Sequence, residues 1–431
     1  MRKSFTATVL MLLTALLCLS GSAYAQKKSK KKASAQAKSG VMPAWEKGYL
    51  DIHFISTVTG ESTFIIMPDG TQMLVDMAGA LHGPEDPMFM PWRPDDSRRP
   101  GEWINRYISR CMQWTGNSTI DYVSVTHFHG DHMGSYKPDL PQSSNGDYQM
   151  ISFADVLDGN KVGMLVDRGW PDYSYPLDMT GSKSMQCYHK CVKYHMQNGM
   201  QVERFKTGYD DQFVMKYDAQ AYPDFKIMNI AANCAVWTGN GHETYSAVPE
   251  HSLLSGKGAS KDMCPSENAV STVFKLSYGD FDYYGGGDVT HNGRKYYAWK
   301  DIETPIANVV GEVEVMKSDH HGSSDSNHDY FVRTLSPQAV ILTVWRNVQP
   351  KGGLQKYLND NVNGGMTDLF STSLDMGLEE KLGSGAARIL SKEGHLVVRV
   401  NPGGESYYIY SLSDKDESMN INERFGPYKS R

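Results

Sequence analysis

A dense group of histidines follows an apolar segment in the first half of the chain. The sequence VTHFHGDHMG contains, within six residues, His127, His129, Asp131 and His132. The preceding segment IDYVSV, residues 120–125, has the length and β-branched content of a buried strand. A hydrophobic core would be destabilised by so many polar groups, so the strand must deliver them to a loop. We therefore expect an α/β chain with its chemistry at the end of a buried strand.

The spacing of the cluster is typical of a metal site. In a loop that leaves a strand, His127 and His129 point the same way and can hold one divalent cation, while Asp131 and His132 face a second position. Imidazole suits zinc and similar metals, and an added carboxylate permits a second ion. The alternative is a polar loop without metal, which the strand directly before the cluster disfavours.

Two later segments also end apolar strands with potential ligands. Asp288 follows FDYYGGG, where the glycines let the backbone approach closely, and its carboxylate could bridge two ions or belong to a simple turn. His320 and His321 follow the strand VEVM. One could bind metal while the other donates a proton to a leaving group, or both could be ordinary loop histidines. The triple glycine is not a phosphate loop, because no Gly-Lys-Ser/Thr follows it.

The rest of the pattern alternates strands and helices. Residues 49–80 predict successive short strands with a turn at Pro68–Gly70. Residues 101–114 have helical spacing and are followed by Gly116 as a stop signal. The stretch 135–265 is less regular and predicts a long insertion. Within it, residues 182–200 predict an amphipathic helix with Met185, Tyr188, Val192 and Met196 on one face.

The N-terminus has the pattern of an export signal. Arg2 and Lys3 precede an apolar run and the sequence Ala-Tyr-Ala, which predicts a secretory signal peptide over residues 1–25. Its apolar run is short for a bilayer span of about 20 residues, and no later stretch is long and apolar enough. Residues 26–45 are basic and small, which predicts a flexible linker. We expect a periplasmic or secreted protein without a transmembrane span after cleavage.

Composition narrows the class of protein. With 40% hydrophobic and 21% charged residues the chain is globular, and its net charge of −6 excludes a global basic field that would recruit nucleic acid or anionic lipid. Five cysteines follow the predicted cleavage site, so at least one is unpaired. Cys187, Cys191 and His195 share one helix edge and could form another metal site, although ordinary packing is the preferred interpretation.

Four motifs in this order resemble the metallo-β-lactamase superfamily: MLVD ending at Asp76, THFHGDHMG, GGGD ending at Asp288, and HHGS. The closer resemblance is to the ComEC-type subgroup, a hydrolase domain attached to competence DNA-uptake channels and also found free in secreted proteins. It extends from about Tyr49 to Leu412, with 135–265 poorly matched. It implies an αββα four-layer sandwich with a long insertion, in a domain 46–412 followed by a C-terminal tail 413–431.

The resemblance also implies a site with two divalent metal ions, zinc or manganese. His127 and His129 would hold the first ion, and Asp288 would bridge both. The second ion would be held by Asp131, His132 and one of His320 or His321. Asp76 would orient the site through hydrogen bonds from outside the ligand set.

The chain departs from the superfamily pattern at one position. Glu267 and Asn268 stand where most members have another histidine just before a strand, as the ComEC-like subgroup tends to. The first metal would then have fewer ligands, bind weakly or use Glu267. His242 and His251 lie upstream and are further candidates. We place Glu267 and Asn268 beside the ligand set.

These features predict an exported metal-dependent hydrolase that uses metal-activated hydroxide, with Asp131, His320 and His321 as catalytic residues. A bridging carboxylate favours a phosphodiester substrate, either nucleic acid or a phospho-decorated polymer. Arg93, Arg98 and Arg99 could bind its phosphates, although an exposed loop is the preferred interpretation. The alternatives are a hydrolase of carboxylic esters, thioesters or lactones, and an inactive metal-binding scaffold that binds a partner.

Overall fold

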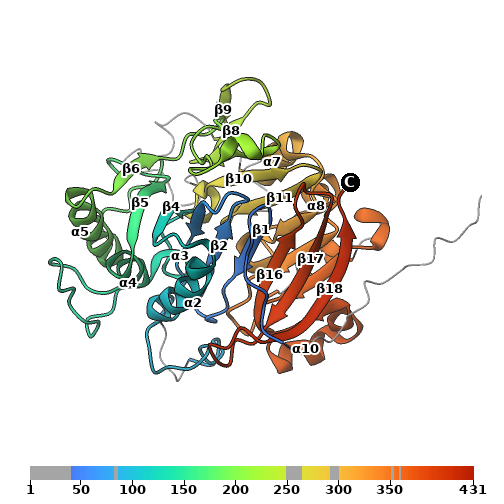
Figure 1. Cartoon of the computed structure of the whole chain (residues 1–431), viewed down its shortest axis with the longest axis horizontal. Coiled ribbons are helices and arrows are strands. Elements are labelled where there is room, and N and C mark those ends of the chain that lie inside the picture. The colour runs from blue at the N-terminus through green and yellow to red at the C-terminus, as the bar shows by residue number, and fades with distance from the viewer. Residues whose placement is uncertain (1–39, 82–85, 249–264, 292–299, 351–353, 359–360) are drawn as a thin grey trace, which may run out of the picture. The chain divides into compact units, whose positions relative to one another are not determined.

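Two nine-stranded mixed sheets form the framework of the chain in its computed structural model (Figure 1). The structure describes residues 40–431 except 82–85, 249–264, 292–299, 351–353 and 359–360, all within one unit, Ala33–Arg431. The predicted signal peptide and residues 26–39 of the predicted linker lie outside the described residues. Among the residues described, no helix combines the length and apolar character that a bilayer span requires.

The first sheet has the strand order β18-β17-β16-β1-β2-β3-β4-β5-β6. Its strands are β1 (Leu50–Phe54), β2 (Thr63–Ile66), β3 (Gln72–Val75), β4 (Thr119–Val125), β5 (Lys161–Asp167), β6 (Gln201–Arg204), β16 (His395–Val400), β17 (Ser406–Leu412) and β18 (Ile421–Lys429). Strands β3 to β6 are parallel neighbours, and the other pairs are antiparallel. The predicted hairpin at Pro68–Gly70 joins β2 to β3, and Gly70 adopts the positive φ of 94° that the turn requires.

The second sheet has the order β15-β14-β13-β12-β11-β10-β7-β8-β9. Its strands are β7 (Phe225–Ala232), β8 (Ala235–Trp237), β9 (Thr244–Ser246), β10 (Val273–Tyr278), β11 (Phe281–Gly286), β12 (Val315–Lys317), β13 (Ala339–Leu342), β14 (Asp368–Ser371) and β15 (Ile389–Ser391). From β11 to β15 the neighbours are parallel. The carboxyl ends of these strands therefore meet at one edge of the sheet.

Helices connect and cover the strands. The α-helices are α2 (Pro100–Thr115), α3 (Gly130–Met133), α4 (Ser152–Gly159), α5 (Lys183–Gln197), α7 (Glu303–Val310), α8 (Asp329–Leu335), α9 (Leu354–Tyr357) and α10 (Met376–Leu382). The described residues also form the short 3-10 turns η1 (Ala219–Ala221), η3 (Asn268–Val270), η5 (Asp319–Gly322), η6 (Asn363–Gly365) and η7 (Gly383–Arg388). The predicted helix at 101–114 is α2, which ends at Gly116 with φ 71°.

Three hydrophobic cores divide the structure into four layers. The alternation along β2 shows the principle, because Phe64 and Ile66 pack in the core with α2, α4 and α5, while Ile65 packs in the core between the sheets. The rings of Phe54 and Tyr283 meet across the two sheets with centroids 6.1 Å apart. A third core joins the outer face of the second sheet to α7 and α8. The expected αββα arrangement is confirmed.

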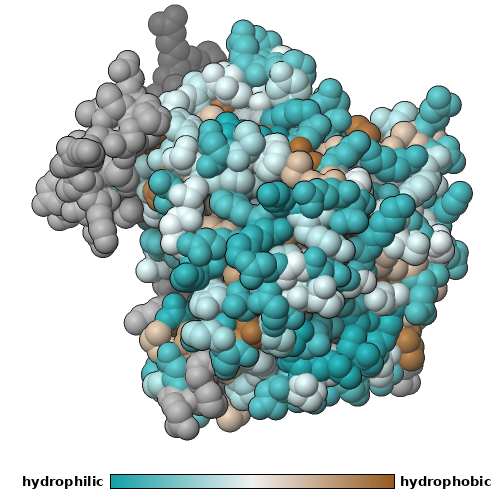
Figure 2. Space-filling model, turned by 90° about the vertical axis from the view of Figure 1, so that its left-hand side faces the viewer, coloured by the Kyte–Doolittle hydropathy of each residue, from teal (hydrophilic) through white to brown (hydrophobic). Residues whose placement is uncertain are grey.

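The helical layer over the first sheet is polar on its outside. Figure 2 shows the face that lies at the left of Figure 1, over α4, α5 and β6, as mainly hydrophilic with small separate apolar spots. In α5, Met185, Tyr188 and Val192 are buried as expected, but Met196 is 37% exposed. Met196 was predicted on the buried face, and it lies instead near the end of the helix, where the core no longer covers it.

The predicted insertion and the predicted C-terminal tail both contribute strands to the sheets. The stretch 135–265, predicted as an insertion, supplies β5 and β6 to the first sheet and β7 to β9 to the second. The predicted tail 413–431 contains β18, which pairs antiparallel with β17 along its length. Both segments therefore extend the edges of the sheets.

Candidate metal centre

Four potential metal ligands from three separate segments meet between the two sheets. Asp131 and His132 come from α3, which begins just after β4, Asp288 follows β11, and His321 lies in η5 after β12. One ligand atom from each of these four residues lies within 4.8 Å of the others. The carboxyl ends of parallel strands from both sheets thus supply the site, a common location in α/β proteins.

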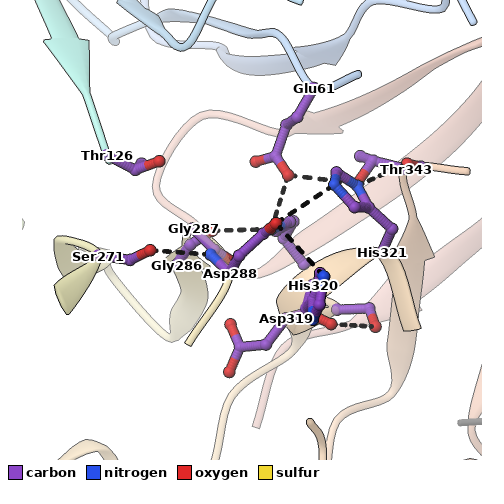
Figure 3. Close-up of polar contacts among 12 residues, drawn as sticks. Glu61, Thr126, Ser271, Gly286, Gly287, Asp288, Asp319, His320, His321 and Thr343 are labelled. Atoms are coloured by element: carbon purple, nitrogen blue, oxygen red, sulfur yellow. Dashed lines mark hydrogen bonds and ion pairs between the residues drawn. The ribbon is translucent and has the colours of Figure 1, made fainter. Parts of the chain in front are cut away.

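The distances centre on one carboxylate oxygen of Asp288. Its Oδ2 atom lies 3.2 Å from Nε2 of His132 and 3.5 Å from Nε2 of His321. Asp131 Oδ2 lies 3.2 Å from the same His321 nitrogen and 3.8 Å from that of His132. In Figure 3 the side chains of Asp288 and His321 point toward each other, and His320 lies beside them.

Unsatisfied polar atoms indicate that this group fits a divalent cation. Nε2 of His132 and Oδ1 of Asp288 are buried and have no hydrogen-bond partner among the described residues. Buried polar atoms are normally paired, so such orphans in a group of imidazoles and carboxylates are typical of a ligand set. Two imidazoles and two carboxylates are a donor set that zinc accepts and that manganese also tolerates.

His127 and His129 lie next to the four-residue group but outside it. Nε2 of His127 is 3.1 Å from Nδ1 of His129 and 3.9 Å from Oδ2 of Asp288. His127 is fully buried, whereas His129 is partly exposed. Oδ2 of Asp288 thus lies near His127 as well as near His132 and His321. Occupation of the pair by a second cation remains a prediction.

The two consecutive histidines of η5 have different surroundings. His321 is fully buried and belongs to the ligand group, and its Nδ1 atom is 2.9 Å from the carbonyl oxygen of Thr343. The side chain of His320 is 24% exposed. Its Nε2 atom is 3.9 Å from Asp288 Oδ2, and its Nδ1 atom is 2.8 Å from Asp325 Oδ1. The geometry favours His321 as the ligand and leaves His320 free to face a substrate.

The backbone at these histidines is strained. His320 and His321 have φ values of 45° and 54°, in the left-handed region that few residues other than glycine adopt. Such conformations cost about 1–3 kcal/mol each and persist where the surroundings enforce them. Here Asn327 accepts a hydrogen bond from the backbone N–H of Asp319 at 3.0 Å, which holds the start of the turn.

Hydrogen bonds that involve Asp76 and Thr126 hold the loop that carries the histidines. Asp76 is fully buried, and its Oδ2 atom lies 2.7 Å from Nδ1 of His132. Its carboxylate also accepts hydrogen bonds from the backbone N–H of Thr126 at 2.8 Å and the Thr126 hydroxyl at 2.6 Å. The second nitrogen of His132 is thereby turned toward Asp288. Asp76 thus contacts a candidate ligand without belonging to the four-residue group.

Glu267 does not face the candidate metal ligands. Its Oε1 atom accepts hydrogen bonds from the backbone N–H of Phe128 and from Nε of Arg168, both at 2.8 Å, and Oε2 lies 2.5 Å from Nη2 of Arg168. The idea that Glu267 serves as a metal ligand is therefore not supported, because a fully buried guanidinium occupies both oxygens. Glu267 instead holds the backbone between the two histidines of the loop. Asn268 contacts the site through Nδ2, 3.3 Å from Nε2 of His320.

The electrostatics of the group are those of imidazoles among carboxylates. Burial alone would lower the pKa of His132, but Asp288 and other neighbouring carboxylates raise it well above its ordinary value. For His321 the same opposition, with Asp288 and Asp131 prevailing, raises the pKa to about 9. Burial and the nearby His132 lower the pKa of His127 well below its ordinary value.

The carboxylates show the reverse effect. Burial would raise the pKa of Asp288, but the nearby imidazoles hold it well below its usual range. These imidazoles belong to His132, His321 and His320. Burial likewise opposes the lowering of the pKa of Asp131 to about 2 by its histidine neighbours. Both carboxylates are therefore ionised at neutral pH and ready to bind a cation.

Three residues close to the site were not identified from the sequence. Glu61, in the loop between β1 and β2, and Lys317, at the end of β12, form a buried ion pair of 2.6 Å. Thr343, just after β13, contacts both His321 and Glu61. Lys317 precedes the paired histidines at a strand end, which is a weak signal, and nothing in the sequence indicates its partner.

Other candidate residues lie elsewhere. His242 places Nδ1 2.8 Å from the carbonyl oxygen of Gly208 and stacks on Tyr209, and His251 lies outside the described residues. Arg93 and Arg99 form ion pairs with Asp414 and Asp155, and Arg98 lies over Trp103. These arginines therefore form no free basic track.

The cysteines of α5 are unpaired and buried, like the other described cysteines, Cys111 and Cys234. Cys191 and His195 meet Asp158 rather than Cys187, with ligand atoms of the three residues within 4.8 Å. The carboxylate of Asp158 already accepts hydrogen bonds from Tyr148 at 2.7 Å and Ser143 at 2.6 Å, and lies 2.8 Å from Nε2 of His195. These contacts are those of a hydrogen-bonded network between α4 and α5.

Comparisons with known proteins do not identify a function for the chain. No family model matches the chain, and no curated protein matches it. One similar solved structure is described as a "Putative metal-dependent hydrolase" from Parabacteroides distasonis, with 12% identity and a TM-score of 0.32. The match covers 78% of this chain and 98% of that one. A similarity this low says nothing about what the chain binds or cleaves.

Proposed function

We propose that the chain is a metal-dependent hydrolase of the metallo-β-lactamase superfamily, close to the ComEC-type subgroup. The observation that carries this proposal is the convergence of Asp131, His132, Asp288 and His321 within 4.8 Å. The orphaned nitrogen of His132 and the orphaned oxygen of Asp288 support it, because a shared cation would satisfy both.

Each residue has a part in the proposed reaction. When bound, a divalent cation lowers the pKa of a coordinated water and stabilises negative charge on oxygen. Asp131, whose side chain is 15% exposed, is placed to accept a hydrogen bond from the attacking water. His320 is placed to donate a proton to the leaving group, because it is the more exposed imidazole and Asp325 orients its other nitrogen.

A phosphodiester is the proposed substrate. Within the four-residue group, Asp288 is the carboxylate that also lies near His127, with Oδ2 3.9 Å from Nε2 of that histidine. Asp288 would therefore serve both ligand sets if two cations were bound, and a cation pair would supply the charge stabilisation that phosphoryl transfer needs. Zinc is the proposed metal and manganese the second choice. The substrate is nucleic acid or a phospho-decorated polymer. The internal pairing of Arg93 and Arg99 gives no added support to nucleic acid.

The test starts from protein stripped of metal by a chelator. Bis(p-nitrophenyl) phosphate hydrolysis is measured before and after addition of Zn²⁺ or Mn²⁺, together with metal content by elemental analysis. We expect activity to return with metal and to fall at least about 100-fold in Asp288→Asn. The matched control is Asp282→Asn near the start of β11, the strand that precedes Asp288. The carboxylate of Asp282 lies 2.8 Å from Nζ of Lys275 and does not belong to the ligand group. Equal losses in both variants would contradict the proposal.

Two other results would favour the alternative functions over a phosphodiesterase. Turnover of p-nitrophenyl acetate, a thioester or a lactone without phosphodiesterase activity would identify a carboxylic ester hydrolase. Metal binding without turnover of any of these would identify an inactive scaffold that binds a partner. Export is also proposed, and fractionation of cells with N-terminal sequencing tests it, because the mature chain should begin at Gln26.

A further inference from the structure

A buried ion pair joins the two sheets beside the candidate metal centre. The side chains of Lys317 and Glu61 are 0% and 2% exposed, and Nζ lies 2.6 Å from Oε2. Glu61 belongs to the first sheet's β1–β2 loop and Lys317 to the end of β12 in the second sheet. In Figure 3 Glu61 enters from one side of the site, and Asp288, His320 and His321 enter from the other.

Lys317 holds the peptide that carries Asp288. Its ammonium donates hydrogen bonds to the carbonyl oxygens of Gly286 at 3.0 Å and Gly287 at 2.7 Å. On the other side of the same peptide unit, the N–H of Asp288 donates to the hydroxyl of Ser271 at 3.1 Å. The peptide between Gly287 and Asp288 is thus held at both its oxygen and its nitrogen. Nζ also lies 3.9 Å from Oδ1 of Asp288, the oxygen without a hydrogen-bond partner among the described residues.

Glu61 contacts the remaining ligand segments. Its backbone N–H donates a hydrogen bond of 2.9 Å to the carbonyl oxygen of Asp131. Its carboxylate accepts one of 3.3 Å from the hydroxyl of Thr343, whose carbonyl oxygen is 2.9 Å from Nδ1 of His321. The backbone at Gly60 packs directly against the backbone of Asp131, because a Cβ at Gly60 would overlap the carbonyl oxygen of Asp131.

Stability alone does not explain this pair. Burying two charges costs several kcal/mol, and a well-packed apolar pair of similar volume is often as stable or more stable. A charged pair at this place has instead a geometric consequence. The ammonium of Lys317 holds the peptide before Asp288, and the carboxylate of Glu61 holds Thr343, which contacts His321. The backbone N–H of Glu61 binds the carbonyl oxygen of Asp131, so the ion pair links all three ligand segments across the two sheets. Their directional hydrogen bonds fix distances that apolar contacts would leave adjustable.

We propose that Lys317 and Glu61 are positioning residues that fix Asp288 and His321 relative to Asp131 before a cation binds. The inference rests on the proposed metal centre and deepens it. Neither residue belongs to the four whose ligand atoms converge. Their effect is on the affinity and the coordination geometry of the metal, because misplaced ligands bind the same ion less tightly.

The test measures metal affinity rather than turnover. Zn²⁺ binding to the stripped full chain is measured by competition with a chromophoric chelator, and the visible absorption of the Co²⁺-loaded protein reports the coordination geometry. We expect Lys317→Met and Glu61→Gln each to weaken Zn²⁺ binding about 10- to 100-fold and to shift the Co²⁺ bands. Lys317→Arg, which keeps the charge and donors, should recover part of the affinity.

The control is another buried ion pair. Arg399 and Asp51 pair across β16 and β1 through contacts of 2.8 and 2.5 Å. Arg399→Met should lower the melting temperature and leave the Zn²⁺ affinity and the Co²⁺ spectrum unchanged. If Lys317→Met fails to fold, the double variant Lys317→Met/Glu61→Leu, which buries no unpaired charge, takes its place.

The outcomes separate the two proposals. Wild-type Zn²⁺ affinity in Lys317→Met or in the double variant would overturn the positioning role. A wild-type chain that binds Zn²⁺ but cleaves no substrate would refute the hydrolase, while the affinities would still decide the role of the pair. A wild-type chain that binds no Zn²⁺ would overturn both.

Discussion

Binding of one Zn²⁺ should release about two protons from the four-residue group at pH 7. Metal ligands must be deprotonated, so an imidazole that is cationic in the apoprotein loses its proton when the ion binds. The pKa of His321 is raised to about 9, and that of His132 is raised well above its ordinary value. We expect both imidazoles to be cationic at pH 7, because the surrounding carboxylates raise both pKa values. The carboxylates of Asp131 and Asp288 have lowered pKa values and contribute no protons.

The same reasoning gives the pH dependence of affinity. Two protons exchanged for one ion change the dissociation constant by about 100-fold per pH unit, or about 2.7 kcal/mol, between pH 6 and 8. Affinity rises with pH in this window, and the slope decreases as the pH passes the value of about 9 for His321. His127 adds nothing, because its lowered pKa keeps it neutral in the apoprotein.

Calorimetry can count these protons. Zn²⁺ is titrated into stripped protein at pH 6.5 in two buffers with different ionisation enthalpies, and the difference in heat gives the number of protons released. A variant His321→Gln that still binds Zn²⁺ should release one proton fewer. Release of one proton or none from the wild-type chain would refute the reasoning, since it would show that the carboxylates do not hold both imidazoles in the cationic form.

Three further predictions concern single residues. Asp76→Asn should weaken Zn²⁺ binding about 10- to 100-fold, because it removes the charged partner of His132, and chelator competition would measure it. His320→Gln should retain its metal by elemental analysis but lose about 10²- to 10⁴-fold in kcat, least for substrates with an acidic leaving group. Burial lowers the pKa of His395 to about 3, so the unfolded chain alone takes up a proton as pH falls below about 6.5. Between pH 7 and 5 this costs about 2 kcal/mol of unfolding free energy, and urea denaturation of His395→Gln should show that loss removed.

The parts of the fold that the sequence predicted are those with strong local signals. The strand 120–125, the helix ending at Gly116 and the turn at Pro68–Gly70 each depend on contacts close in the sequence. Several edge strands were not predicted because their hydrophobic pattern is short or weak. β8 has three residues, and Phe425 is the one fully buried residue of β18 (Ile421–Lys429).

The site divides in a similar way. The sequence singled out residues at strand ends, and the structure brings Asp131, His132, Asp288 and His321 together there. It could not decide between His320 and His321, because that choice depends on a left-handed turn that exposes one ring and buries the other. It offered Glu267 as a ligand, whereas the partner that occupies Glu267, Arg168, lies 99 residues away.

The pair Glu61–Lys317 shows why such contacts are hard to infer. The sequence around each residue carries no motif that indicates its partner, and the two residues are 256 positions apart (317 − 61). What joins them is the packing of one sheet on the other, which no local pattern encodes. The candidate metal ligands follow strand ends, so the hydrophobic pattern of the strands indicates where they lie in the sequence. The groups that hold ligands at fixed distances need only reach the same space, and that is decided by how the layers stack.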